Sequence, residues 1–219
     1  DRLVTGGHDT VVRVWDLATG NVLLEMEGHR RLISDIAVRP GGERIVSAGY
    51  DGAVIEWDAV AGKEIRQWSS SGADGSRKTE PVMAVAVSPA DGSVFIGTWH
   101  GVVCRIPPDG GDFVPFDAAH EGSVTSIVCA PDGSCVFSAG ADGAIPRHSP
   151  EGRFLSKTRA HSREVKKIDA AMSSSGLILA SAGYDNVVRL WNGDMEKPVR
   201  ELKGHSWPPT CVALSRDGS

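Results

Sequence analysis

Short apolar runs separated by polar turn residues make up this chain from end to end. Residues 11–15 (VVRVW), 82–87 (VMAVAV) and 177–181 (LILAS) are rich in β-branched and apolar side chains, which favour strands. Turn pairs such as Asp91-Gly92 supply the positive φ angles that tight hairpins need. No stretch of useful length carries a helical period, so the pattern predicts an all-β chain. The near-continuous apolarity predicts strands covered on both faces, as in stacked sheets.

A five-residue turn recurs along the chain and sets its organisation. It reads TGGHD at 5–9, SAGYD at 47–51, IGTWH at 96–100, SAGAD at 138–142 and SAGYD at 181–185. The last residues of these turns are 42, 49, 42 and 43 positions apart. Six residues after each turn comes Trp15, Trp57, Ile106, His148 or Trp191, and Gly-His or Ala-His pairs end at His29, His120, His161 and His205.

Together, these recurring marks resemble the WD-repeat β-propeller family. The resemblance covers essentially all 219 residues and implies a single propeller domain of four-stranded antiparallel blades. The repeat marks stand at 1–16, 28–58, 81–106, 119–148, 160–192 and 204–219.

The blade count leaves two arrangements open. Strands counted from the marks number three before His29, four in each of the next four blades and one after His205, which equals five blades. Joining the two ends would place Asp9 23 positions after His205, close to the 22 and 24 found within the chain, so the ring could close with five blades. The alternative is an excerpt of a longer chain that builds a larger propeller. We favour the excerpt, because the family most often has seven blades and the chain lacks an initiator Met and stops in mid-hairpin.

The family's blades contain a hydrogen-bonded tetrad of His, Ser or Thr, Asp and Trp, which the resemblance carries over position by position. Two sets are complete: His29, Ser47, Asp51 and Trp57, and His161, Ser181, Asp185 and Trp191. Two are partial: His120, Ser138 and Asp142, with His148 in the Trp position, and Thr5, Asp9 and Trp15, which His205 would complete. The third blade has Ile96, His100 and Ile106 and no Gly-His mark. Because Trp only donates, Asp only accepts, and Ser and His do both, such a chain buries four polar groups with few left unpaired.

The same residue types could suggest a Ser-His-Asp catalytic triad or a histidine metal site. A catalytic set occurs once, however, whereas these sets recur in register, and each His belongs to a different blade. We therefore expect no catalytic residue, no metal ligand and no cofactor.

The resemblance implies a narrow top face that carries most contacts with partner proteins. It holds the residue before each tetrad Asp and residues that follow the Gly-His marks. Here these are His8, Tyr50, Trp99, Tyr184, Arg30, Leu32, Glu121 and Glu164. Exposed aromatic rings suit a protein interface, although some of them could instead pack over a neighbouring turn. The charges are of mixed sign, so no single charged ligand is predicted.

The composition of the chain narrows the range of partner classes to expect. A net charge of -5 disfavours nucleic acid, and no apolar stretch is long enough to cross a bilayer. The four cysteines show no metal-binding spacing and read as core thiols, with a disulfide between Cys129 and Cys135 as the alternative in an oxidising compartment. A Ser/Gly-rich insertion at 69–80 reads as a surface loop or a partner-specific loop.

The sequence therefore predicts an intracellular, non-enzymatic scaffold or adaptor that binds other proteins or peptides, in the cytoplasm or the nucleus. No small-molecule substrate and no membrane insertion are expected. The first alternative is a regulatory or targeting module of a larger enzyme, such as a kinase or a ubiquitin-ligase component. A propeller enzyme is a third reading, and it would need unrepeated polar groups that converge on the central channel.

Overall fold

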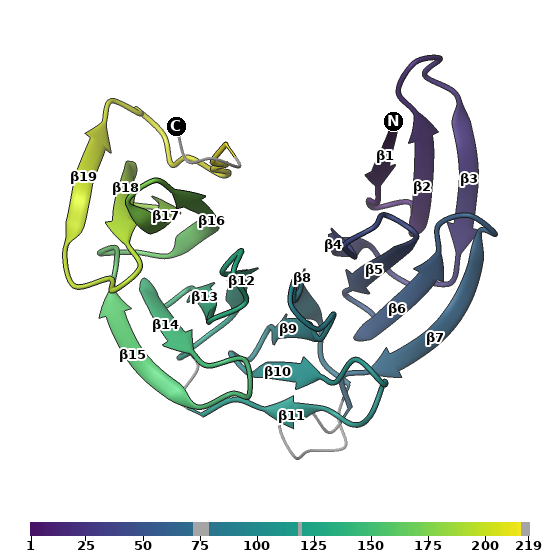
Figure 1. The fold of residues 1–219 in the computed structure, drawn as a ribbon, viewed down its shortest axis with the longest axis horizontal. Helices are drawn as coiled ribbons and strands as arrows, with labels where there is room; N and C mark the ends of the chain where they lie inside the picture. The colour runs from purple at the N-terminus through teal and green to yellow at the C-terminus, as the bar shows by residue number, and fades with distance from the viewer. Residues whose placement is uncertain (72–78, 118–119, 216–219) are drawn as a thin grey trace.

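The computed structural model describes residues 1–71, 79–117 and 120–215. In this part of the chain there are strands and turns but no helix, and hence no helix able to cross a membrane. The strands form five antiparallel sheets, four of them with four strands and one with three. The sheets stand side by side along an arc (Figure 1), as expected for propeller blades. The prediction of an all-β chain built from antiparallel blades is confirmed.

Each sheet is one blade, and consecutive strands pair within it. Blade 1 contains β1 (Arg2–Thr5), β2 (Val11–Asp16) and β3 (Val22–Glu27). Blade 2 contains β4 (Ile33–Val38), β5 (Arg44–Gly49), β6 (Ala53–Asp58) and β7 (Lys63–Ser69), and blade 3 contains β8 (Val82–Val87), β9 (Val94–Thr98), β10 (Val103–Ile106) and β11 (Val114–Pro115). Blade 4 contains β12 (Val124–Cys129), β13 (Val136–Gly140), β14 (Ala144–His148) and β15 (Phe154–Arg159), and blade 5 contains β16 (Val165–Ser173), β17 (Gly176–Gly183), β18 (Val187–Asn192) and β19 (Pro198–Lys203).

The first strand of each four-stranded blade lies on the inner side of the arc and the fourth on the outer side (Figure 1). In each four-stranded blade, the first two strands pair with a β-bulge at the same place, as between Ile33 and Asp35 in blade 2 and between Val165 and Lys167 in blade 5. A bulge redirects a strand and increases its twist. The repeat in sequence is therefore also a repeat in backbone irregularity.

The hydrophobic core lies between blades. One cluster joins Val12 and Val14 of blade 1 to Ile45 and Trp57 of blade 2, and three further clusters link the following blades in the same way. Because blades 2, 3 and 4 are covered on both sides by their neighbours, their middle strands are mostly apolar. This is the origin of the continuous apolar runs in the sequence.

Polar side chains add specific links between neighbouring blades. The hydroxyl of Ser34 donates to the carbonyl oxygen of Val82 at 2.6 Å, and the Asp35 carboxylate accepts the Val85 N–H at 3.0 Å, so both bonds join blade 2 to blade 3. The fully buried Glu56 carboxylate pairs with Arg39 and Arg66, whose guanidiniums also reach the carbonyl oxygens of blade 3. Register between blades is thus set by directional bonds as well as by apolar packing.

The ring is open, and the alternative of a closed five-bladed ring is wrong for this structure. Blades 1 and 5 face each other across the opening of the arc (Figure 1). Residues 204–215 form no strand, and the Leu214 N–H donates to the Asp169 carboxylate of blade 5 at 2.7 Å. Five blades at this curvature span only part of a circle, so this segment stays beside blade 5 and does not pair with β1. The excerpt of a larger propeller stays a prediction.

Substitution of Gly143 tests how closely neighbouring blades approach each other. An added Cβ would lie 2.6 Å from the His161 carbonyl oxygen and 2.7 Å from that of Arg163, at a φ of +76°. We expect Gly143→Ala to lower the free energy of unfolding by about 2–5 kcal/mol, from backbone strain plus the clash. Gly42→Ala is the control, because Gly42 has the same φ of +76° but no atom within 4 Å of the added Cβ. Equal losses in urea unfolding of the two variants would contradict the close contact.

Candidate functional site

In blade 2, the predicted tetrad residues lie in one hydrogen-bonded chain. His29 Nε2 is 2.7 Å from Ser47 Oγ, and His29 Nδ1 is 3.1 Å from Asp51 Oδ1. The Trp57 indole N–H donates to the same Ser47 hydroxyl at 2.8 Å. Asp51 also accepts the backbone N–H groups of Arg30 at 2.6 Å and Ala53 at 3.0 Å, so it ties the turn before β6 to the segment before β4.

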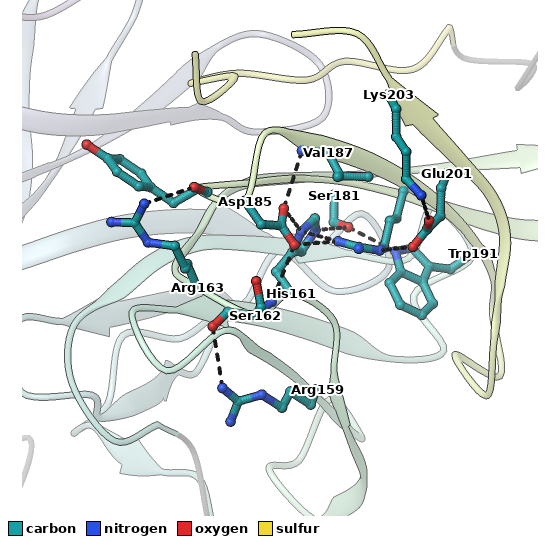
Figure 2. A network of polar contacts seen from close by, with 12 residues as sticks. Arg159, His161, Ser162, Arg163, Ser181, Asp185, Val187, Trp191, Glu201 and Lys203 are labelled. Carbon is teal, nitrogen blue, oxygen red and sulfur yellow. Dashed lines mark hydrogen bonds and ion pairs between the residues drawn. The ribbon is translucent and has the colours of Figure 1, made fainter. Parts of the chain in front are cut away.

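Blade 5 repeats this chain and extends it (Figure 2). His161 lies 2.8 Å from both Ser181 Oγ and Asp185 Oδ1, and Trp191 donates to Ser181 at 2.9 Å. Arg189 adds an ion pair to Asp185 at 2.8 Å and continues to Glu201 on the outer strand. Burial alone would raise the pKa of Asp185, but hydrogen bonds from Arg189 and His161 lower it to about 2. This aspartate is therefore ionised at neutral pH.

Blade 4 keeps only three members of the chain. His120 contacts Ser138 Oγ and Asp142 Oδ1, both at 2.9 Å. His148, which occupies the Trp position, bonds instead through Nε2 to the Asp117 carbonyl oxygen at 2.7 Å and packs against Phe116. Burial lowers the pKa of His148, which favours the neutral imidazole. Ser138 consequently has one fewer polar partner than its counterparts in blades 2 and 5.

In blade 1 the structure brings together only part of the predicted set. Trp15 donates to Thr5 Oγ1 at 2.7 Å, whereas the Asp9 carboxylate pairs with Arg13. His205 is exposed and makes no hydrogen bond to these residues in the described part of the chain. The tetrad that a closed ring would have completed is therefore not formed.

Blade 3 holds a pair that the sequence analysis missed. Glu80 lies two residues before the first strand of its blade, whereas the tetrad histidines lie four residues before theirs, and its Oε2 is 2.6 Å from Nδ1 of His100, which stands in the Asp position. The carboxylate is now the buried partner, with Glu80 only 6% exposed, while the His100 side chain is 70% exposed. This pair differs from the tetrad in position as well as in residue type. A search for a carboxylate about 20 residues before the last residue of the recurring turn, here His100, would have found this pair.

The buried polar chains are internally satisfied and closed to substrate. Ser47 and Ser181 are fully buried, and their hydroxyl oxygens already bind both an imidazole and an indole. An activated serine nucleophile needs an accessible hydroxyl beside a single base. Among the described residues, no three His, Cys, Asp or Glu side chains gather as a metal site would require. The tetrad geometry can therefore hold a blade together, but it offers no reaction site.

The predicted top-face residues are joined by a repeated backbone hydrogen bond. The Tyr50 N–H donates to the Leu32 carbonyl oxygen at 3.0 Å, and the Tyr184 N–H donates to that of Glu164 at 2.7 Å. Blades 3 and 4 make the same bond from Trp99 and Ala141. The turn that precedes the third strand and the segment that follows the His position thus lie at one end of every four-stranded blade. We call this end the top face.

Two of the three top-face aromatic rings are neighbours. Tyr50 and Trp99 have ring centroids 6.4 Å apart at a tilt of 57°, and Trp99 is 48% exposed. Tyr184 is covered on its own blade, because the Arg163 guanidinium and the Lys166 ammonium lie 4.6 and 4.8 Å from its ring. The open aromatic surface is therefore the Tyr50–Trp99 pair.

A hollow of about 390 Å³ adjoins this pair between blades 1 and 2. His8, Thr10, Arg30, Arg31, Leu32 and Tyr50 line it. Four of these six residues were predicted for the top face, while Thr10 and Arg31 were not. Glu121 lies over blade 4, where a separate hollow is lined by acidic and basic groups together, including Asp142 and Lys157. The hollow beside Tyr50 is therefore lined by basic residues without an acidic one, whereas the hollow over blade 4 contains both signs of charge.

A larger hollow of about 740 Å³ lies at the opposite end of blades 1 and 2. Its walls include Arg2, Val4, Ile36, Val38 and Val60. It opens beside β1, where blade 1 lacks the inner strand that the four-stranded blades have.

The insertion and the cysteines are the remaining features that the sequence analysis singled out. Most of the insertion, residues 72–78, lies outside the described residues. None of the four cysteines, all of which the structure describes, is in a disulfide; Cys104 and Cys135 are buried, Cys129 is half-buried and Cys211 is exposed. Burial raises the pKa of the Cys129 thiol to about 12, so it is unreactive as a nucleophile at neutral pH.

The difference between blades 4 and 5 yields a paired stability test. Ser181→Ala leaves both the Trp191 N–H and His161 Nε2 buried without this partner, and we expect it to cost about 2–4 kcal/mol. Ser138→Ala removes a hydrogen-bond partner from His120 alone, and we expect it to lower the free energy of unfolding by about 1–2 kcal/mol. Chemical unfolding of both variants measures the difference. A loss at Ser138 as large as that at Ser181 would show that the indole bond contributes nothing.

Comparison with known proteins agrees with this architecture. The family profile described as WD domain, G-beta repeat, matches residues 20–58, 113–145 and 150–192, which together exceed half of the chain. The chain is 28% identical over 204 residues to mouse (Mus musculus) telomerase protein component 1, an alignment that covers 87% of this chain and 7% of that protein. It is 25% identical over 204 residues to the ribosome biogenesis protein WDR12 homolog of Chlamydomonas reinhardtii, covering 88% of this chain and 40% of the relative.

A third relative shows the same relation between the lengths. Autophagy-related protein 16 of Arabidopsis thaliana is 24% identical over 223 residues, covering 98% of this chain and 42% of the relative. The chain thus spans less than half the length of each of these curated relatives. With the profile match and the repeated blade geometry, the chain belongs to the WD-repeat (WD40) family.

Proposed function

We propose that this chain is a non-enzymatic scaffold or adaptor that binds a partner protein or peptide on its top face. The Tyr50–Trp99 pair beside the adjoining hollow is the observation that carries this proposal. Two large rings with few rotatable bonds give extensive contact area at little entropic cost. A hollow that accepts one side chain next to them provides a specific anchor.

The distribution of polar groups supports binding over catalysis. The repeated Ser, His and Asp groups are consumed in the tetrads, and the top-face groups are aromatic or charged side chains without a buried base among them. The relatives include a protein component of telomerase, a name that describes a part of a larger assembly, and a ribosome biogenesis protein. An intracellular setting, in the cytoplasm or the nucleus, stays part of this proposal.

Double substitution Tyr50→Ala/Trp99→Ala tests the proposed interface. We expect affinity purification with quantitative mass spectrometry to show at least a tenfold loss of the partner set, since removal of central aromatic anchors costs about 2 kcal/mol or more. Tyr184→Ala is expected to have a smaller effect, because its ring is already covered by Arg163 and Lys166.

Trp207→Ala is the matched control, because Trp207 is an aromatic residue that is 81% exposed beyond blade 5. It should leave the partner set unchanged. All variants are first shown to unfold at the wild-type temperature. A partner set that survives loss of Tyr50 and Trp99 but not of Trp207 would place the interface at the opening of the arc instead.

A further inference from the structure

The arginines beside the top-face hollow differ from the partly buried arginines of blades 2 and 5. Arg39 and Arg66 pair with Glu56, and Arg189 pairs with Asp185 and Glu201. By contrast, the exposed guanidiniums of Arg30 and Arg31 make no hydrogen bond or ion pair with the described residues. Two adjacent cations at one hollow are therefore available for an external anion.

The other polar groups that line the hollow add hydrogen-bond donors and no carboxylate. His8 and the hydroxyl groups of Thr10 and Tyr50 line the same space, and none of them is hydrogen-bonded through its side chain within the described part of the chain. Arginine binds planar anions through two parallel N–H donors, and neutral hydroxyl groups can complete the shell. The hollow combines these donors with one apolar wall, Leu32.

The neighbouring carboxylates are already occupied. Asp9 pairs with Arg13, and its pKa is lowered chiefly by that hydrogen bond. Asp51 binds His29 and two backbone N–H groups on the interior side of the turn. Neither carboxylate is paired with the Arg30 or Arg31 guanidinium. The net character of the hollow is consequently cationic, although the chain as a whole carries -5.

We propose that this hollow binds an Asp or Glu side chain of an acidic segment in the partner protein, while the Tyr50–Trp99 pair receives an adjacent apolar residue. This assignment rests on the proposed function, because it names the partner chemistry for the same face. A volume of about 390 Å³ accommodates a side chain with its flanking backbone but not a folded domain. Tyr50 belongs to both the hollow and the aromatic pair, so a single extended peptide would contact the two subsites together.

Selection from a phage-displayed library of random twelve-residue peptides tests this assignment. Peptides selected on the wild-type chain should carry Asp or Glu at a fixed position, next to an apolar residue. Synthetic versions should bind Arg30→Gln/Arg31→Gln about tenfold or more weakly than the wild type, since each lost pair removes a charge-assisted contact. The same loss is expected when the peptide's acidic residue is replaced by its amide.

Arg153→Gln/Arg200→Gln is the matched control. Both arginines are exposed, neither is ion-paired in the described residues, and the double change alters the net charge by the same amount. We expect this control to bind the selected peptides within about twofold of the wild type, because distant exposed charges are screened at physiological salt. Equal losses in the two double variants would show a general charge effect and overturn the assignment.

The remaining outcomes separate this inference from the proposed function. Selected peptides that need Tyr50 and Trp99 but carry no acidic residue would overturn the cationic subsite and leave the top-face interface standing. Selection of no peptide that depends on the top face would count against both. A phosphoserine in place of the acid that binds more than about tenfold tighter, or poly(U) RNA that binds through Arg30 and Arg31 more tightly than the peptides, would reassign the hollow to a phosphate ligand.

Discussion

The hydroxyl group of the second strand is the point on which each complete blade depends. In blades 2 and 5, one serine oxygen binds both the imidazole of the preceding segment and the indole of the third strand. The imidazole then holds the aspartate that fixes the top-face turn. A single buried oxygen therefore connects the middle of the sheet to the surface that we propose for binding. Because unpaired buried polar groups are costly, each member of the chain stabilises the groups that it contacts.

The blades that depart from this chain contain other polar contacts. Blade 3 has the Glu80–His100 pair, and in blade 4 His148 bonds to the Asp117 carbonyl oxygen, in the segment between blades 3 and 4. Blade 1 keeps only the bond between Trp15 and Thr5 and pairs Asp9 with Arg13. The repeat therefore tolerates the loss of individual tetrad members. This tolerance leaves the top-face positions free to differ in chemistry from blade to blade.

Much of this architecture could be predicted from spacing, because the period and the buried strands follow from local residue patterns. The tetrad contacts in blades 2 and 5 fall where the fixed offsets put them. The open ring could not be predicted, since closure depends on long-range curvature rather than on matching ends. Glu80 and Arg31 were missed because both lie beside, not on, the repeated positions. The cover over Tyr184 likewise comes from Arg163 and Lys166, whose packing no repeat pattern encodes.

Site-specific photocrosslinking most directly tests whether partners bind the top face. A benzophenone amino acid would replace Leu32 in the top-face hollow or Val60, which is 66% exposed beside the larger hollow at the opposite end of the same blades. After irradiation in extract of the native cells, a top-face interface predicts specific protein adducts from position 32 and only background from position 60. Adducts formed from position 60 and absent from position 32 would place the binding surface at the opposite end of the blades and contradict the proposed function.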